Sequence, residues 1–295
     1  MIPPAFLVIG AMKCATTTLY HDLLQNPSFT CYEKEEGLFL HPDWEQAFNR
    51  SARDVSTADS GSGCLYGEIC TMYSMLPDVP GIPSRVAKLL GKQVKIVYLV
   101  RNPLHRTMSH HQHFFNWTGK GRMGGNINQE LALHPQLLHY SCYGMQIESW
   151  IAQFGRDAIH VMRFEDYVSD RRVALKGLCD FLGARDKFGP LRGMGENRGD
   201  SRRVAGAGVL RLYQTEVFHK LLKPYTPSFL RTALRAVLLR NAKTTVIAPA
   251  PATIDQMLEV LAPDAERFAK LIGANKPLWD LADTAHHLKK STKLK

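Results

Sequence analysis

The stretch of sequence that decides the fold is FLVIGAMKCATTTL, residues 6–19. It begins with an apolar run typical of a buried strand, turns at Gly10 and continues as the start of a helix. In a parallel sheet such a unit aims the free N–H groups and positive dipole end of the helix at the carboxyl edge of the sheet. Lys13 adds a charge there, and threonines 16–18 add hydroxyl donors. The stretch predicts a site for a phosphate-like group, although a capping Thr16 and a solvated Lys13 would show the same pattern.

The rest of the chain repeats this alternation of short β-branched runs and helical patterns, which is typical of a parallel sheet covered on both faces. We expect an α/β fold, a P-loop-like parallel sheet flanked by helices, in one domain spanning residues 1–295 with a helical C-terminal portion from about residue 208. The expected strands are 6–9, 29–32, 65–69, 95–100 and 159–164. The expected helices are 16–24, 84–90, 103–115, 143–154, 171–182, 207–222, 228–239 and 254–272, and the expected loops are 49–63 and 116–136.

Composition narrows the class of protein. With 45% apolar and 22% charged residues, the chain can bury a core. Its apolar runs are too short to cross a bilayer, and its first residues read as a strand instead of a signal peptide, so we expect a cytoplasmic protein with mostly free thiols among its 6 cysteines. The net charge of +10 favours anionic partners. The basic residues are spread along the chain, which argues against nucleic acid as the partner.

A second strand-turn-helix unit is KIVYLVRNPLHRTMS, residues 95–109. Arg101 stands where a buried strand ends, and Pro103 suits a first helical turn. A guanidinium at that position, with the hydroxyl of Ser109 two turns along the helix, suits a phosphate monoester. A structural ion pair of Arg101 is the alternative. The nearby histidines are expected to be surface residues and not metal ligands, because no carboxylate completes a ligand set: His105, His110, His111 and His113.

The two units together resemble the donor-binding motifs of sulfotransferases that use 3′-phosphoadenosine-5′-phosphosulfate (PAPS). Residues 10–19 are similar to the 5′-phosphosulfate loop, G-x-x-K-x-G-T-T-x-L, and residues 101–109 to the 3′-phosphate motif, R-[ND]-P-x-x-R-x-x-S. The resemblance implies that Lys13 contacts the phosphosulfate bridge, that Arg101 and Ser109 bind the 3′-phosphate, and that the remaining loop residues hold the 5′-phosphate: Cys14, Ala15, Thr16, Thr17 and Thr18. Ala15 stands where the family usually has glycine, which would strain the loop if its φ is positive. A weaker likeness places Arg198 and Gly199 in a late loop that closes over the nucleotide.

The acidic segment, residues 33–39 with the sequence EKEEGLF, follows the second expected strand. It resembles the K-E-x-x-F-F segment of Golgi-type carbohydrate sulfotransferases, which implies that Glu35 is the catalytic base. Without the resemblance such a charge run would be read as solvated. Glu68 is a second candidate base or an orienting partner, in a segment similar to G-E-K-[ST]-P, and His41 is a third candidate.

The resemblance implies transfer of the sulfuryl group of PAPS to a hydroxyl, in preference to an amine, without a metal. A carbohydrate, glycolipid or natural product is the expected small-molecule or glycan acceptor. One alternative is a nucleotide-dependent phosphoryl transferase, but the Walker pattern G-x-x-x-x-G-K-[ST] is absent from residues 10–19. The other alternative is a non-enzymatic protein that binds polyanions or a membrane surface through its positive charge.

Overall fold

The computed structural model describes residues 5–46, 64–116, 123–191, 204–205, 239–240 and 246–293. Its centre is a 5-stranded sheet with the order β2-β3-β1-β4-β5, and every pairing in it is parallel. The strands are β1 (Phe6–Gly10), β2 (Phe29–Cys31), β3 (Leu65–Ile69), β4 (Lys95–Val100) and β5 (Ile159–Arg163). The expected α/β fold is confirmed, and the strand boundaries agree with the sequence prediction to within one residue.

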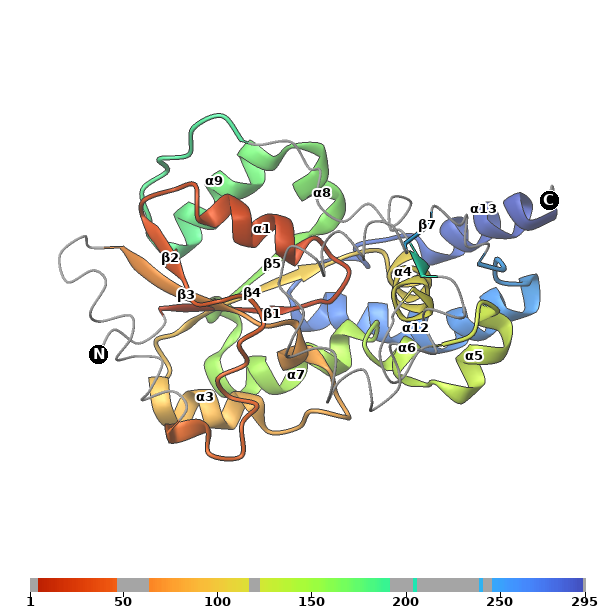
Figure 1. Ribbon diagram of the computed structural model, residues 1–295, viewed down its shortest axis with the longest axis horizontal. Helices are drawn as coiled ribbons and strands as arrows, with labels where there is room; N and C mark the ends of the chain where they lie inside the picture. The colour runs from red at the N-terminus through yellow and green to blue at the C-terminus, as the bar shows by residue number, and fades with distance from the viewer. Residues whose placement is uncertain are drawn as a thin grey trace.

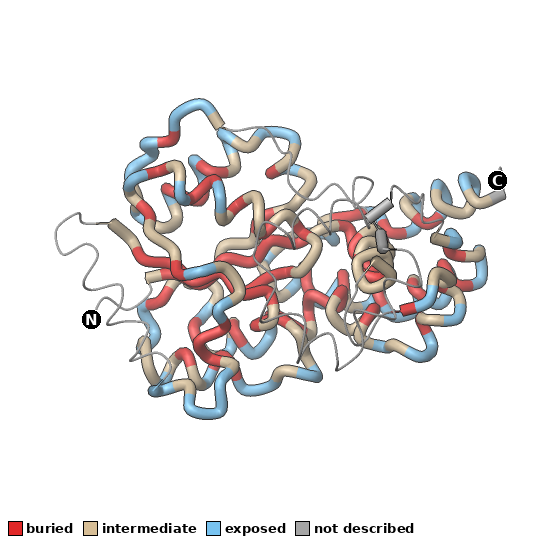
Figure 2. Tube along the Cα trace, viewed as in Figure 1, coloured by how far each residue is buried: buried red, intermediate tan, exposed pale blue. Residues whose placement is uncertain are grey.

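Helices cover both faces of the sheet, with α1, α8 and α9 on one face and α3 and α7 on the other (Figure 1). These helices are α1 (Thr16–Leu23), α3 (Ile82–Leu90), α7 (Tyr143–Phe154), α8 (Phe164–Ser169) and α9 (Arg171–Leu182). Since both faces are covered, β1 and β4 are buried almost along their whole length, which explains their unbroken apolar sequences. The buried residues concentrate on these central strands and on the helix faces turned toward them (Figure 2).

Most of the remaining helices gather beyond the carboxyl edge of the sheet, and the long helix at 251–271 runs back from there along α7 (Figure 1). The remaining helices are α4 (Pro103–Phe115), α5 (Ile127–Leu133), α6 (Gln136–His139), α12 (Pro251–Leu271) and α13 (Leu281–Lys293), and a 3₁₀ turn, η1 (Thr71–Ser74), follows β3. The expected C-terminal helix at 254–272 is therefore present as α12, whereas those at 207–222 and 228–239 lie outside the described residues. None of the helices in the described ranges is long and apolar enough to cross a bilayer.

One expectation about the loops was wrong. Residues 127–133, which the sequence analysis placed in a loop, form helix α5. The side chain of Asn126 caps this helix by accepting a hydrogen bond from the backbone N–H of Asn128. Ile127 and Leu131, one turn apart, are both buried. The segment is polar in composition and therefore resembles a loop, although it forms a capped helix with only two buried apolar residues.

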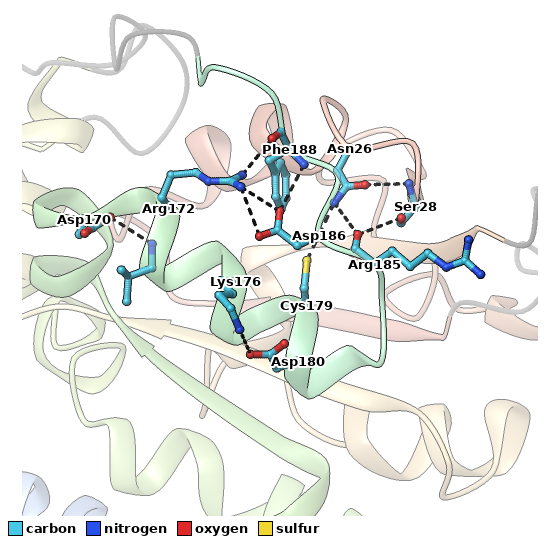
Figure 3. Close-up of polar contacts among 11 residues, drawn as sticks. Asn26, Ser28, Asp170, Arg172, Lys176, Cys179, Asp180, Arg185, Asp186 and Phe188 are labelled. Carbon is cyan, nitrogen blue, oxygen red and sulfur yellow. Dashed lines mark hydrogen bonds and ion pairs between the residues drawn. The ribbon is translucent and has the colours of Figure 1, made fainter.

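The chain after α9 is fastened to the turn between α1 and β2 (Figure 3). The amide of Asn26 and the hydroxyl of Ser28 both donate to the carbonyl of Arg185, at 3.1 and 3.0 Å. Arg172 donates to the carbonyl of Phe188 at 3.1 Å, and the Phe188 ring stacks on Phe29. These contacts fix residues 185–188 beside the amino end of β2.

Candidate active site

The N-terminal loop, residues 10–15, connects β1 to α1 at the carboxyl edge of the sheet. Gly10 has φ 149°, and a Cβ added to it would lie 2.1 Å from the hydroxyl oxygen of Ser74. Only glycine fits there, since η1 packs directly against the turn. The backbone N–H of Ala11 donates to the carbonyl of Leu99 at 2.6 Å, which ties the loop to β4.

Two further residues of the N-terminal loop adopt left-handed backbone conformations. Lys13 has φ 72° and Ala15 has φ 67°. For residues with a Cβ this conformation costs about 1 kcal/mol or more each. The glycine that the family pattern places at position 15 thus has a physical reason, and this chain holds the same turn with an alanine.

Helix α1 begins at Thr16 without a side-chain cap. Its N-cap residue is Ala15, and its first turn contains no acidic residue. The alternative in which Thr16 merely caps this helix is therefore wrong, because the cap position falls one residue earlier. Among the described residues, no hydrogen bond is formed by the hydroxyls of Thr16, Thr17 or Thr18. The first amides of α1 and these hydroxyls are available to an anion.

The second motif, residues 101–109, leaves β4 at the neighbouring position of the same edge. Asn102 caps α4 by accepting hydrogen bonds from the backbone N–H groups of Leu104 and His105, and its own N–H donates to Glu165 at 2.9 Å. Glu165 thus stabilises the turn between β4 and α4. The guanidinium carbon of Arg101 lies 4.6 Å from the ring centroid of Phe164.

The charge of Arg101 has no acidic partner within the described ranges: none of the ion pairs there involves it. The structural ion pair considered as an alternative for Arg101 is not formed among these residues. Ser109, on the same helix, is half-buried, and its hydroxyl likewise makes no hydrogen bond to the described part of the chain. The cation and the hydroxyl predicted to bind a phosphate are both available.

Tyr143 links the two motifs. Its hydroxyl donates to the carbonyl of Arg101 at 2.8 Å, accepts from the N–H of Arg101 at 3.1 Å, and lies 3.8 Å from the sulfur of Cys14. Burial raises the pKa of Cys14 to about 11, while the positive charges of Arg106 and Arg101 oppose that rise. The Cys14 thiol therefore stays neutral, and both arginine charges are felt at the N-terminal loop.

Arg106 reaches the N-terminal loop from inside the protein. It is completely buried, and its Nη1 donates to the carbonyl of Met12 at 3.3 Å. Its Nη2 lies 2.9 Å from Nδ1 of His110, whose pKa burial and the Arg106 charge hold well below the usual value. The ring of His110 is thus neutral and accepts at Nδ1.

The histidines of α4 correct the sequence analysis. His110 and His111 are both fully buried, and not surface residues. His110 stacks on Tyr140, the residue after α6, and Nε2 of His111 donates to the carbonyl of Gly124, shortly before α5, at 2.8 Å. Both rings are buried because α5 and α6 pack against α4. Within the described ranges no group of His, Cys, Asp and Glu side chains is arranged to hold a metal ion.

Glu35 lies beside the end of β3, the strand next to β1. Its backbone N–H donates to the carbonyl of Ile69 at 2.9 Å, and its φ is 65°. The N–H of Thr71 donates to its Oε2 at 2.7 Å, the Thr71 hydroxyl donates to Oε1 at 3.1 Å, and the ammonium of Lys34 forms an ion pair with it. Since η1 begins at Thr71 and contacts Gly10 through Ser74, the carboxylate and the N-terminal loop are parts of one edge.

Glu68 lies in β3 itself and is fully buried. Its Oε1 accepts from the N–H of Leu38 at 2.9 Å and from the hydroxyl of Tyr73 at 2.5 Å, and Tyr73 in turn accepts from the N–H of Phe39. Its Oε2 has no hydrogen-bond partner in the described part of the chain. Burial raises the pKa of Glu68 to about 7, against the lowering effect of the Tyr73 hydrogen bond.

The raised pKa of Glu68 predicts that the protein loses stability as the pH rises from 4.5 to about 7. Over that range the unfolded chain has released the Glu68 proton while the folded chain still binds it, so unfolding becomes easier. The loss is on the order of 3 kcal/mol. Glu68→Gln, which cannot ionise, should remove it, as urea denaturation at about pH 5 and about pH 8 would show. An equal change in both proteins would contradict the assignment.

The structure brings most of the predicted site residues to one edge, but not all can be placed. The N-terminal loop follows β1, Arg101 and Ser109 follow the adjacent strand β4, and Glu35, which follows β2, lies beside the end of β3. His41 is exposed, and Arg198 and Gly199 lie outside the described residues. Neither Tyr143 as the link between the motifs nor Arg106 as the support of the loop was predicted from the sequence. For Arg106 a signal existed, since its place in the second motif puts it one turn into α4.

Comparison with known proteins agrees with this geometry. The sequence model of the family described as "Sulfotransferase domain" matches residues 82–192, which contain the second motif but not the N-terminal loop. No curated protein matches the chain. The sulfotransferase family predicted from the sequence is thus confirmed on residues 82–192, and the match supports sulfuryl transfer as the activity.

A similar fold is found in a solved sulfotransferase structure. A sulfotransferase from Alicyclobacillus acidocaldarius superposes with a TM-score of 0.60 at 19% identity, covering 94% of this chain and 98% of its own. The sulfotransferase domain from the curacin biosynthetic pathway superposes with a TM-score of 0.49 at 16% identity, covering 88% and 98%. The first of these shows that the arrangement of sheet and helices is that of a sulfotransferase.

Proposed function

We propose that the chain transfers the sulfuryl group of PAPS to a hydroxyl acceptor. The single observation that carries the proposal is the pair of anion-binding turns on β1 and β4, which are neighbours in the sheet and are linked through Tyr143. One nucleotide with phosphates at its 3′ and 5′ positions can contact both turns at once. The alternative of a phosphoryl transferase has no such need for a second phosphate site.

The residues present fit this donor. The N-terminal loop offers uncapped amides and the threonines 16–18 for the 5′-phosphate, with Lys13 beside them and Cys14 and Ala15 contributing backbone. Arg101 and Ser109, neither of them paired within the described ranges, suit the 3′-phosphate. Arg198 and Gly199 remain predicted contacts in the late loop. PAPS, when bound, supplies the sulfuryl group and a phosphate that leaves with the bond's electron pair.

Each step of the mechanism is assigned to residues at this edge. Glu35 takes the proton of the acceptor hydroxyl while that oxygen forms its bond to sulfur. Lys13 and the amides of α1 stabilise the charge that develops on the departing phosphate oxygen. Preorganised donors of this kind contribute several kcal/mol in a site that excludes water.

Glu35 is a better base than Glu68 on the geometry. The Glu35 side chain is 32% exposed, whereas that of Glu68 is wholly buried. Both oxygens of Glu35 accept hydrogen bonds from Thr71, which fixes the carboxylate without covering it. Glu68 holds the backbone at Leu38 and Phe39, directly and through Tyr73, and so positions the acidic segment that carries Glu35.

The acceptor is proposed to be a carbohydrate, and a glycolipid or natural-product hydroxyl is the next candidate. The support is the likeness of the acidic segment to that of carbohydrate sulfotransferases. The whole chain is proposed to form one domain, since the described C-terminal helix α12 packs against α4 and α7 of the sheet domain.

Adenosine 3′,5′-bisphosphate should raise the melting temperature of the protein much more than ATP with Mg²⁺, because it binds only the native state and contacts both turns.

Arg101→Ala should weaken the binding of nucleotides that carry a 3′-phosphate roughly tenfold to a hundredfold and leave the binding of those without it nearly unchanged. Thermal shift and titration calorimetry measure both effects.

Arg163→Ala is the matched control for that measurement. Arg163 ends the adjacent strand β5 and also lies over an aromatic ring, that of Trp279, but it is paired with Asp166. Its loss should not change the preference for a 3′-phosphate. Equal thermal shifts from the bisphosphate and from ATP would contradict the proposed donor and favour a phosphoryl transferase.

A further inference from the structure

Arg106 is a buried cation whose charge is not balanced by any carboxylate in the described part of the chain. Its side chain is 0% exposed, and none of the ion pairs within the described ranges includes it. A buried charge is costly unless it is paired or fully hydrogen-bonded. Its Nε donates to the hydroxyl of Ser141 at 2.6 Å, and Nη2 donates to the carbonyl of Leu137 at 3.3 Å. With His110 and Met12 these partners come from three parts of the chain.

The contact with Met12 is the one that concerns the site. Met12 directly precedes Lys13 in the N-terminal loop, and Arg106 Nη1 donates to its carbonyl. The loop's left-handed residues, Lys13 and Ala15, are strained, and such backbone persists only where the surrounding structure holds it. Arg106 is a buried side chain that donates a hydrogen bond to a backbone carbonyl of this loop.

We infer that Arg106 is a positioning residue: it holds the N-terminal loop in its anion-binding shape, and the bound donor's 5′ group supplies the negative charge that no carboxylate of the described residues places beside it. The inference rests on the proposed function, because it concerns the proposed 5′-phosphate site. It extends that proposal to a residue that touches the loop from behind. The role is distinct from that of Arg101, which is proposed to touch the 3′-phosphate.

Arg106→Lys tests the inference, since it keeps the charge but loses the planar fork that reaches Met12, His110 and Ser141 together. Titration calorimetry would compare adenosine 3′,5′-bisphosphate with adenosine 3′-monophosphate, which lacks the 5′ group. The Kd of the monophosphate divided by the Kd of the bisphosphate measures what the 5′-phosphate contributes to binding. We expect Arg106→Lys to reduce this ratio roughly tenfold to a hundredfold, with most of the change in the bisphosphate.

Arg156→Lys is the matched control. Arg156 also binds main-chain carbonyls, those of Ile272 and Ile159, but it lies at the start of β5, at the opposite edge of the sheet. It should lower the melting temperature without changing the ratio. A ratio in Arg106→Lys equal to that of the wild type, or an equal loss of both nucleotides, would overturn the inference and leave Arg106 a structural residue. A wild-type protein that gains nothing from the 5′-phosphate would instead remove the proposed function as well.

Two further variants test the same inference if Arg106→Lys does not fold. Ser141→Ala removes the acceptor of Nε and leaves the guanidinium in place, so the ratio should fall a few-fold in the same direction. Adding Ala15→Gly should restore part of the ratio, because glycine adopts the left-handed turn without strain. An unchanged ratio in Ser141→Ala, or no restoration by Ala15→Gly, would contradict a role exercised through the shape of the loop.

Discussion

Glu35→Gln should lower the turnover of sulfuryl transfer by a factor of about 10² to 10⁴, the usual contribution of a general base. Glutamine keeps the size of the side chain and can still accept hydrogen bonds from Thr71, but it cannot take a proton. The affinity for adenosine 3′,5′-bisphosphate should barely change, since Glu35 is not assigned to the donor. Steady-state kinetics with PAPS and a sulfated sugar product, together with calorimetry, would separate the two quantities.

The neighbouring carboxylates provide the controls. Glu33→Gln and Glu36→Gln change the same charged segment and should retain nearly full turnover. Glu68→Gln should lower turnover less than Glu35→Gln, because it disturbs the position of the acidic segment and not the proton transfer. If Glu35→Gln were active and Glu68→Gln inactive, the base would be Glu68. Full activity in all four variants would rule out a carboxylate base and direct attention to the exposed His41.

The parts of the fold that the sequence predicted are those set by local pattern. β1 and β4 are buried on both faces, so their apolar runs are unbroken and easy to recognise. The start of α4 could be predicted from Asn102, which caps the helix, and from Pro103 in its first turn. The helix at 127–133 was missed, because its polar residues resemble a loop and its burial comes from contacts made far along the chain.

In the candidate site, too, some features follow from local sequence spacing and others depend on packing between distant elements. The position of Lys13, Arg101 and Ser109 at one edge of the sheet could be predicted, because their spacing within each motif is local and parallel strands bring the two motifs together. The exposure of the α4 histidines could not, since it depends on α5 and α6 packing over that helix. The place of Arg106 in the second motif is a local signal, but its contact with Met12 joins residues on different elements, so the spacing does not predict that contact.

The positive φ of Ala15 gives a physical reason for the glycine that the family pattern has at this position. A glycine at this position would need no justification, but an alanine at φ 67° shows that the left-handed turn is kept even at a cost. The turn is therefore required by something other than local preference. The contacts of Gly10 with Ser74, of Ala11 with Leu99 and of Met12 with Arg106 supply that requirement.

Lys13→Ala should impair both binding and chemistry, unlike Glu35→Gln. Lysine at this position is assigned both to the phosphosulfate in the ground state and to the charge that develops on the leaving phosphate. Affinity for adenosine 3′,5′-bisphosphate should fall roughly tenfold or more, and turnover at saturating donor should fall by a further factor of about 10² to 10³. Alanine is the right substitution, because it keeps a Cβ at φ 72° and so leaves the backbone strain in place, which glycine would relieve.

Lys88→Ala serves as the matched control for Lys13→Ala. Lys88 lies on α3 and forms an exposed ion pair with Glu45, so its loss should change neither quantity. A Lys13→Ala variant that binds weakly but turns over normally at saturation would confine Lys13 to binding. In that case the uncapped amides of α1 would be left as the groups that stabilise the leaving phosphate, since they are the remaining donors assigned to that side of the site.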